Sequence, residues 1–191
     1  LTHCIEAYTV QLHQPITDAL ALKGISMIAE NLEKAYENGE DREARRNMMI
    51  ASTIGGMAFI SSNVGAVHAF AETVGAWFDT PHGVANSLFL PYIMEFNIPA
   101  CPERFADIAD AMGIEREESM SDEQYALKAV EYVKALNRKL NIPTIKEIKG
   151  ITEERFEAIA ERSANNVLSN DNARKITKEE YLELLKKAYN E

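Results

Sequence analysis

Two of the four histidines lie where their imidazole rings could do chemistry. His68 and His82 both fall within residues 65–86, a segment that also holds the single tryptophan and three of the nine glycines. Between these two histidines the only charged side chains are Glu72 and Asp79, whereas charges recur every few residues elsewhere. Histidines in apolar, glycine-punctuated surroundings favour a ligand site over a solvated face.

Helical spacing would bring His68 close to a carboxylate. Apolar residues recur at helical intervals over residues 64–78, which predicts a helix there. His68 and Glu72 are then four positions apart and lie one above the other on the same face. Two such side chains can converge on one cation.

The following corner predicts that a second histidine joins them. Thr80 before Pro81 is typical of a helix start, with threonine as the N-cap and proline in the first helical position. His82 would then lie in the first turn of the next helix. Two helices meeting at a tight corner could carry His68 and His82 to one metal ion, each as a neutral imidazole.

Spacing alone leaves a second interpretation open. A histidine on an apolar helix is commonly a hydrogen-bonded core residue, and a histidine–glutamate pair at this spacing is frequent by chance. The Thr-Pro-His corner is chiefly evidence of a helix start. A metal role for His68 and a structural role both remain possible at this level.

Composition excludes several classes of partner. The chain has 191 residues, a net charge of −10 and a pI of about 5.0, which disfavour nucleic acid and anionic membranes as partners. It holds no run of 18 apolar residues and no signal peptide, so we expect no membrane partner. Two cysteines, Cys4 and Cys101, make no disulfide framework, and a cytoplasmic location is the expectation.

The elements that must position the histidines are all predicted to be helical. No strand pattern, internal repeat or phosphate-binding loop occurs. Residues 1–191 are expected to form one all-α domain of about eight or nine helices. The predicted helices cover residues 16–38, 41–61, 64–78, 81–97, 103–112 and 123–140, with others starting near Leu1, Thr152 and Thr177.

The third helix stands out by its composition. Residues 48–60 are nearly all apolar or small, and a helix that is apolar all round is predicted to be buried. Gly55 and Gly56 destabilise a helix interior by roughly 1 kcal/mol each. They therefore predict that another backbone or a ligand approaches closely. Arg45 and Arg46 at its start are expected on the surface.

The first residues form an unusual beginning. Leu1-Thr2-His3 enters an apolar, helix-like pattern without a methionine or a cap. We therefore expect this chain to be a piece of a longer protein.

Three segments together resemble a known family. Thr2-His3-Cys-Ile-Glu-Ala-Tyr, Gly65-Ala-Val-His68-Ala-Phe-Ala and Pro81-His82-Gly-Val-Ala-Asn resemble the C-terminal domain of the iron-containing (group III) alcohol dehydrogenases, and the resemblance covers essentially the whole chain. It implies a divalent metal, Fe²⁺ or Zn²⁺, that polarises the oxygen of a small alcohol or aldehyde for hydride transfer to or from NAD or NADP. It also implies an N-terminal dinucleotide-binding domain, absent from this chain, and a homo-oligomer.

The resemblance also assigns residues. It implies that His3, His68 and His82 are metal ligands, together with an aspartate four residues before the first histidine, a position that falls ahead of Leu1. The fourth histidine, His13, matches no ligand and is expected to be exposed.

Glu72 departs from the family pattern, because many members carry a histidine there. Three roles stay open for it: a catalytic acid or base, a hydrogen bond to a ligand histidine, or no catalytic role. From position alone, Phe78, Trp77 and the Gly55–Gly56 region are expected to line the substrate pocket.

Three functions remain at this stage. The chain could be the metal- and substrate-binding part of an alcohol dehydrogenase, inactive alone. It could be a stand-alone helical metal-binding or scaffold protein without dehydrogenase activity. It could also be a structural subunit that needs a separate dinucleotide-binding chain.

Overall fold

The computed structural model describes residues 1–191 and contains helices and turns only, which confirms the all-α prediction. Four short 3₁₀ turns connect some of the helices. The nine α-helices are α1 (Thr2–Thr9), α2 (Pro15–Glu37), α3 (Arg42–Ser62), α4 (Ala66–Phe78), α5 (His82–Asn97), α6 (Pro102–Ala111), α7 (Asp122–Lys139), α8 (Phe156–Ala164) and α9 (Lys178–Asn190).

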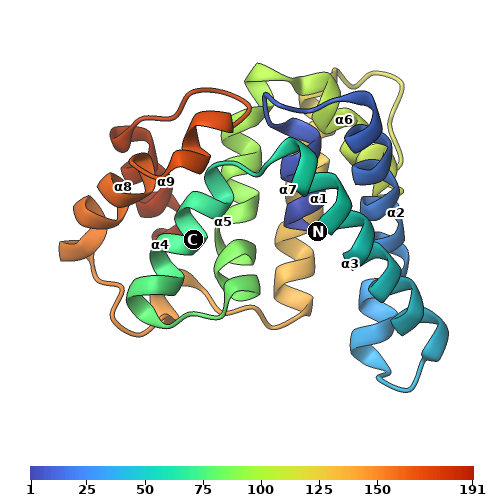
Figure 1. Cartoon of the computed structure of the whole chain (residues 1–191), viewed down its shortest axis with the longest axis horizontal. Coiled ribbons are helices and arrows are strands. Elements are labelled where there is room, and N and C mark those ends of the chain that lie inside the picture. The colour runs from blue at the N-terminus through green and yellow to red at the C-terminus, as the bar shows by residue number, and fades with distance from the viewer.

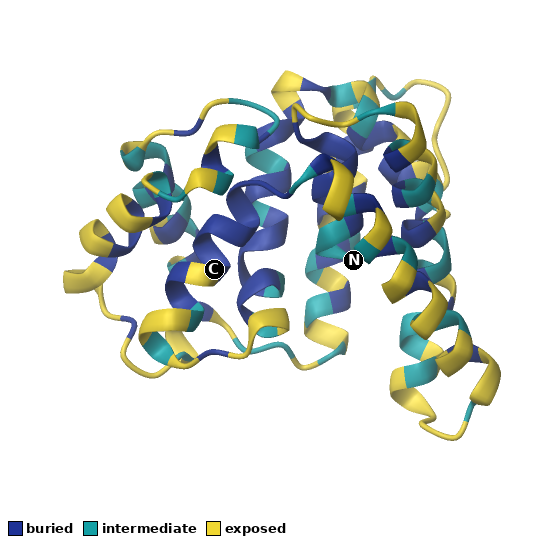
Figure 2. Ribbon diagram, in the orientation of Figure 1, coloured by how far each residue is buried: buried dark blue, intermediate teal, exposed yellow.

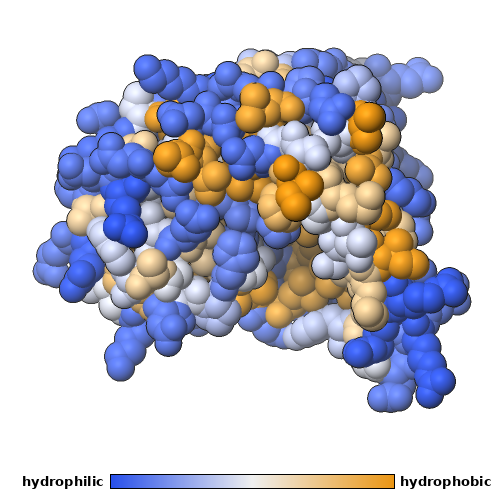
Figure 3. Space-filling view, viewed as in Figure 1, coloured by the Kyte–Doolittle hydropathy of each residue, from blue (hydrophilic) through white to orange (hydrophobic).

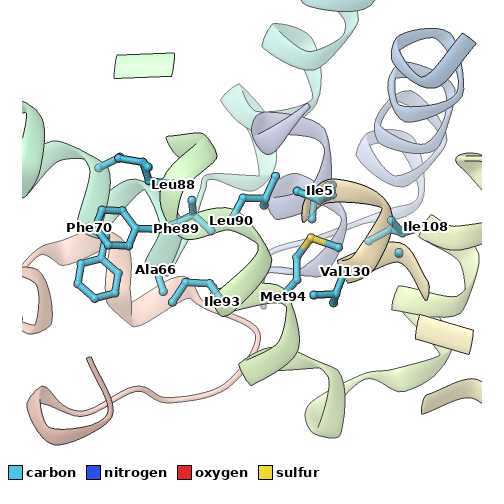
Figure 4. Close-up of a cluster of buried hydrophobic side chains, with 14 of the residues drawn as sticks. Ile5, Ala66, Phe70, Leu88, Phe89, Leu90, Ile93, Met94, Ile108 and Val130 are labelled. Carbon is cyan, nitrogen blue, oxygen red and sulfur yellow. The ribbon is translucent and has the colours of Figure 1, made fainter. Parts of the chain in front are cut away.

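Helices α1, α5 and α7 occupy the middle of the molecule (Figure 1). The α2–α3 hairpin packs on one side of them, and α4 with α8 and α9 packs on the other. One continuous core runs between the two sides, with apolar side chains from α1, α4, α5, α6 and α7 (Figure 4). Within it the rings of Phe70 and Phe89 stack with centroids 4.2 Å apart. The core therefore joins α4 directly to α5, the two helices that carry His68 and His82.

Each outer helix has one buried face and one exposed face (Figure 2). The tip of the α2–α3 hairpin is almost wholly exposed. Each helix taken alone is too short or too polar to span a membrane. Only α3 and α4 taken together, bent by 107° at their junction, meet those criteria by length and composition.

The prediction that the third helix is buried all round is wrong. Small residues face inward from α3, whereas Met49 is 74% exposed and Ile60 is 79% exposed. Apolar side chains accordingly appear on the surface along α3 (Figure 3). Composition predicted burial because it cannot distinguish a face that packs from a face that is only apolar. Arg45 and Arg46 are exposed, as predicted.

The two glycines of α3 have different surroundings. A Cβ added at Gly55 would lie 3.1 Å from the Cys4 sulfur and 3.8 Å from the Cβ of His3, whereas one at Gly56 would meet nothing within 4 Å. The predicted close approach is therefore confirmed at Gly55, and the approaching element is α1. This contact sets α1, and with it His3, against α3.

The corner before α5 is built differently from the prediction. The helix begins at His82 with Pro81 as its N-cap residue, and the Thr80 hydroxyl makes no hydrogen bond although it is buried. Thr80 is thus not the cap. The turn is instead made by Asp79, whose φ of 50° lies in the left-handed region. Asp79 is the C-cap residue at which α4 ends.

Candidate metal centre

Three helices bring His3, His68 and His82 to one point. His3 lies on α1, His68 near the start of α4 and His82 at the start of α5. Each offers a ring nitrogen, and these three nitrogens all lie within 4.8 Å of one another. The centroids of the His3 and His68 rings are 4.7 Å apart, and those of His68 and His82 are 5.3 Å apart. The cluster predicted from the sequence is therefore formed.

The three rings are buried to different degrees. His68 is 4% exposed, His3 is intermediate and His82 is exposed. Burial lowers the pKa of His3 to about 4, helped by the neighbouring His68 and His82. Burial and His68 also lower the pKa of His82, and Glu72 opposes that change. Both effects favour neutral imidazoles, the form that binds metals.

A carboxylate lies directly behind the cluster. Glu6, on α1, contacts Nδ1 of His68 through Oε2 and accepts a hydrogen bond of 2.8 Å from the backbone N–H of Val67 through Oε1. The opposite nitrogen of His68, Nε2, is buried and has no hydrogen-bond partner. Buried polar atoms without a partner are rare, and this one belongs to the ring whose centroid lies 4.7 Å from that of His3 and 5.3 Å from that of His82.

Other side chains hold the remaining two rings. The Phe59 ring stacks on His3 with centroids 4.2 Å apart. The Asn86 side-chain nitrogen donates to the carbonyl oxygen of His82 at 3.0 Å and lies 3.1 Å from Nε2 of the same residue. These contacts hold the rings through packing and hydrogen bonding: Phe59 comes from α3, and Asn86 lies on α5, the helix that carries His82.

Glu72 does not contact the ligand histidines through a hydrogen bond. Its Oε2 accepts a hydrogen bond of 2.7 Å from the side chain of Asn166, and the residue is exposed. The hydrogen bond to a ligand histidine that the sequence left open for Glu72 is supplied by Glu6 instead. Glu72 remains close enough to affect the pKa of His82.

A cavity of about 240 Å³ opens beside the three histidines. The molecular surface is hollowed in the region below the N-terminus (Figure 3). The apolar part of the cavity wall comes from α2, α5 and α7, from the residue that follows α7 and from the first residue of the chain: Leu1, Leu32, Leu90, Val133, Leu136 and Leu140.

The residues expected to line a substrate pocket lie away from this cavity. Trp77 is exposed, with the Arg162 guanidinium 5.5 Å from the centre of its ring. The Phe78 ring lies against Gly150, where an added Cβ would come within 3.1 Å of it. Neither residue lines the cavity beside the histidines.

His13 is exposed, as predicted, and its Nδ1 lies 3.5 Å from a carboxylate oxygen of Asp18. It is therefore outside the cluster.

Sequence reasoning missed Glu6, Phe59 and Asn86. One feature of the sequence points to Glu6: it is the only charged residue in the apolar stretch Cys4-Ile5-Glu6-Ala7-Tyr8. A charge at a position that a helix buries is retained where it has a partner. Its partner His68 lies 62 residues away, so spacing could not identify the pair.

The residues present fit a divalent transition metal. Imidazole nitrogens suit zinc and iron, and three of them converge here from three helices. The unpaired, buried Nε2 of His68 is the atom that a cation would satisfy.

Comparison with known proteins finds matches along almost the whole chain. Residues 1–189 match the model of the "Fe-containing alcohol dehydrogenase family, C-terminal". The chain is 41% identical to alcohol dehydrogenase 4 of Saccharomyces cerevisiae, over 99% of this chain and 48% of that protein. It is 39% identical to 1,3-propanediol dehydrogenase of Citrobacter freundii, over 99% of this chain and 49% of that protein.

Solved structures give the same result. The crystal structure of a 1,3-propanediol oxidoreductase superposes with a TM-score of 0.94 at 38% identity, covering 98% of this chain and 49% of the other. An alcohol dehydrogenase from Oenococcus oeni superposes equally well, with the same identity and coverage. The chain thus spans about half the length of the relatives it matches.

Proposed function

This chain belongs to the Fe-containing alcohol dehydrogenase family, whose C-terminal part it matches. We therefore propose that it forms the metal- and substrate-binding half of an NAD(P)-dependent alcohol dehydrogenase or aldehyde reductase. The observation that carries the proposal is the convergence of three imidazole nitrogens within 4.8 Å of one another. The reaction interconverts a small alcohol and its aldehyde by hydride transfer.

The roles of the residues follow from their surroundings. His3, His68 and His82 would hold Fe²⁺ or Zn²⁺, which when bound supplies Lewis-acid polarisation of the substrate oxygen. Burial of His68 against α1 and α5 shields that side of the centre from water. His82 is exposed, so the substrate would approach from its side.

Glu72 is the group that we propose for proton transfer. Its Oε2 is engaged by Asn166, and its Oε1 makes no hydrogen bond within the chain. The residue is exposed on the same helix as His68, one turn further along. A carboxylate in this position can accept a proton from an alcohol and return it to the solvent.

The remaining components lie outside this chain. The nicotinamide cofactor, NAD or NADP, would be bound by an N-terminal dinucleotide-binding domain, which the roughly twofold greater length of the relatives supports. We propose a homo-oligomer in the cytoplasm, a location supported by the two free cysteines, Cys4 and Cys101.

Metal content tests the proposed centre, and the chain offers a matched control. His82→Ala removes a ligand, whereas His13→Ala removes the one histidine outside the cluster. Elemental mass spectrometry on chains exposed to Zn²⁺ is expected to find one metal per chain in the wild type and in His13→Ala, and none in His82→Ala. Equal metal in both variants would contradict the proposal.

Activity is tested in the protein that also carries the dinucleotide-binding half. There His82→Ala is expected to reduce alcohol-dependent reduction of NAD or NADP by roughly 100-fold or more, because a lost ligand weakens both metal binding and polarisation. His13→Ala should retain wild-type rates.

A further inference from the structure

The carboxylate of Glu6 is buried between two partners. Glu6 is 3% exposed, and no lysine or arginine forms an ion pair with it. Oε1 accepts from the Val67 N–H, in the first turn of α4, and Oε2 contacts Nδ1 of His68. A buried carboxylate is tolerated only where its oxygens are satisfied. Here each oxygen has one partner, and both partners belong to α4.

The partners of Glu6 define where the proton of His68 lies. A neutral imidazole carries one N–H and one bare nitrogen, and a carboxylate oxygen can only accept. The Glu6 contact therefore places the proton on Nδ1 and leaves a lone pair on Nε2. That nitrogen is buried without a partner, in the residue whose ring lies 4.7 Å from His3 and 5.3 Å from His82 between centroids.

We propose that Glu6 is a positioning residue of the metal centre, which holds His68 in the Nδ1-protonated tautomer so that Nε2 presents its lone pair to the cation. The proposal rests on the proposed function for the presence of the cation. The tautomer itself exists without any metal, and can be measured separately. Carboxylates placed behind a ligand histidine in this way typically change metal affinity by about 10- to 100-fold.

The local fold supports this role for Glu6. His3 and Glu6 lie three positions apart on α1, so a single helix carries one ligand and orients another. Gly65 allows the approach, since a Cβ there would lie 3.2 Å from Oε1 of Glu6 and 3.0 Å from Oδ1 of Asn172. The absence of a side chain at Gly65 thus allows α1 to lie close enough to α4 for the Glu6 carboxylate to contact His68.

Glu6→Gln is the sharpest test, because it keeps the shape and changes one oxygen to an amide nitrogen. The Val67 N–H still requires an oxygen, so the amide nitrogen would face Nδ1 and donate to it. The proton of His68 would then move to Nε2, the nitrogen that should bind the cation. We expect ¹⁵N NMR of the metal-free chain to show Nδ1–H in the wild type and Nε2–H in Glu6→Gln.

Zinc affinity provides the second readout. Competition between the chain and a chromophoric chelator for Zn²⁺ is expected to give a dissociation constant about 10- to 100-fold higher in Glu6→Gln than in the wild type. Glu72→Gln is the control for the tautomer measurement alone, because it removes a carboxylate near His82 that does not contact His68. It should leave the His68 tautomer unchanged.

Two results would overturn the proposal: an Nε2–H tautomer in the wild type, or a folded Glu6→Gln variant whose zinc affinity stays within about twofold of wild type. If Glu6→Gln does not fold, the wild-type tautomer decides alone. The dehydrogenase assay can fail while the wild type still shows the Nδ1–H tautomer and Glu6→Gln still binds zinc more weakly than the wild type. That result would reject the proposed function but not the role of Glu6.

Discussion

Burial changes protonation in opposite directions at two side chains of this protein. At His3 it lowers the pKa to about 4, because the imidazolium would be desolvated beside other imidazoles. At Cys101 it raises the pKa of the thiol to about 11, with Glu103 adding to the rise and Arg104 opposing it. In both cases the neutral form is favoured in the folded chain.

The raised pKa of the Cys101 thiol predicts that the protein loses stability at alkaline pH. In the unfolded chain the thiol has its ordinary pKa of 9.0, so between pH 9 and about 11 the unfolded state loses this proton while the folded state keeps it. The free energy of unfolding therefore falls as pH rises through this window, by about 3 kcal/mol in total from this group.

Cys101→Ala should remove that part of the pH dependence. Urea unfolding of wild type and variant at several pH values from about 9 to about 11 measures it, because the tyrosines contribute equally to both proteins. Parallel stability curves for the two proteins would contradict the prediction.

Single residues also show the limit of reading this site from the sequence. His68 and His82 could be placed near one another because both lie at the ends of adjacent predicted helices. The resemblance to a family added His3. The partner of Glu6 could not be identified, since the pairing depends on how closely α1 packs against α4. That approach is allowed by Gly65, which lies 59 positions further along the chain. Long-range contacts of this kind have no local pattern.

Among the helices, α5 contains a proline in its interior that another helix compensates. Pro91 has no N–H, so the carbonyl of Ser87, four residues earlier, lacks its usual helical partner. The side chain of Asn137, on α7, donates a hydrogen bond of 2.7 Å to this carbonyl. The carbonyl that Pro91 leaves without a partner in α5 thus forms a hydrogen bond that joins α5 to α7.

This pair predicts a coupling between positions 91 and 137. Asn137→Ala should lower the free energy of unfolding by about 1–2 kcal/mol, because it leaves the Ser87 carbonyl unpaired. In a Pro91→Ala background the new N–H can bond that carbonyl, and the same substitution should cost at least about 0.5 kcal/mol less. A double-mutant cycle from urea unfolding measures the difference, and strictly additive effects would exclude the compensation.

Most helix positions could be predicted from the sequence, because amphipathic spacing and capping residues are local. Ser121 with Gln124, and Thr177 with Glu180, form capping boxes at the starts of α7 and α9, close to the predicted helix starts. The start of α5 differs from the prediction: Pro81 is the N-cap residue in place of Thr80, and Asp79 makes the turn in the left-handed region. The prediction that α3 is buried on all sides is wrong, because composition does not say which elements pack on each face of a helix.

At the scale of the whole molecule, a metal bound by the three histidines would link α1, α4 and α5. A ligand that binds only the folded state stabilises it by mass action. Free Zn²⁺ at about 100 times its dissociation constant should contribute about 2.7 kcal/mol, which raises Tm by roughly 5–10 °C for a chain of this size.

Thermal unfolding followed by circular dichroism, with and without Zn²⁺, measures this shift. His13→Ala should show the full increase in Tm, and His82→Ala little of it. An equal increase in both variants would indicate that the ion binds elsewhere.

The first turn of α4 has a consequence for the order in which the chain folds. Its Ala66 and Val67 amides are capped by Asn172 and Glu6, residues 106 and 61 positions away, and not by a neighbour. Closing loops of that length is entropically unfavourable and slow compared with forming a local helix. The start of α4, and therefore the setting of His68, would be completed only after the C-terminal segment has docked. The metal centre is then among the last parts of the molecule to mature.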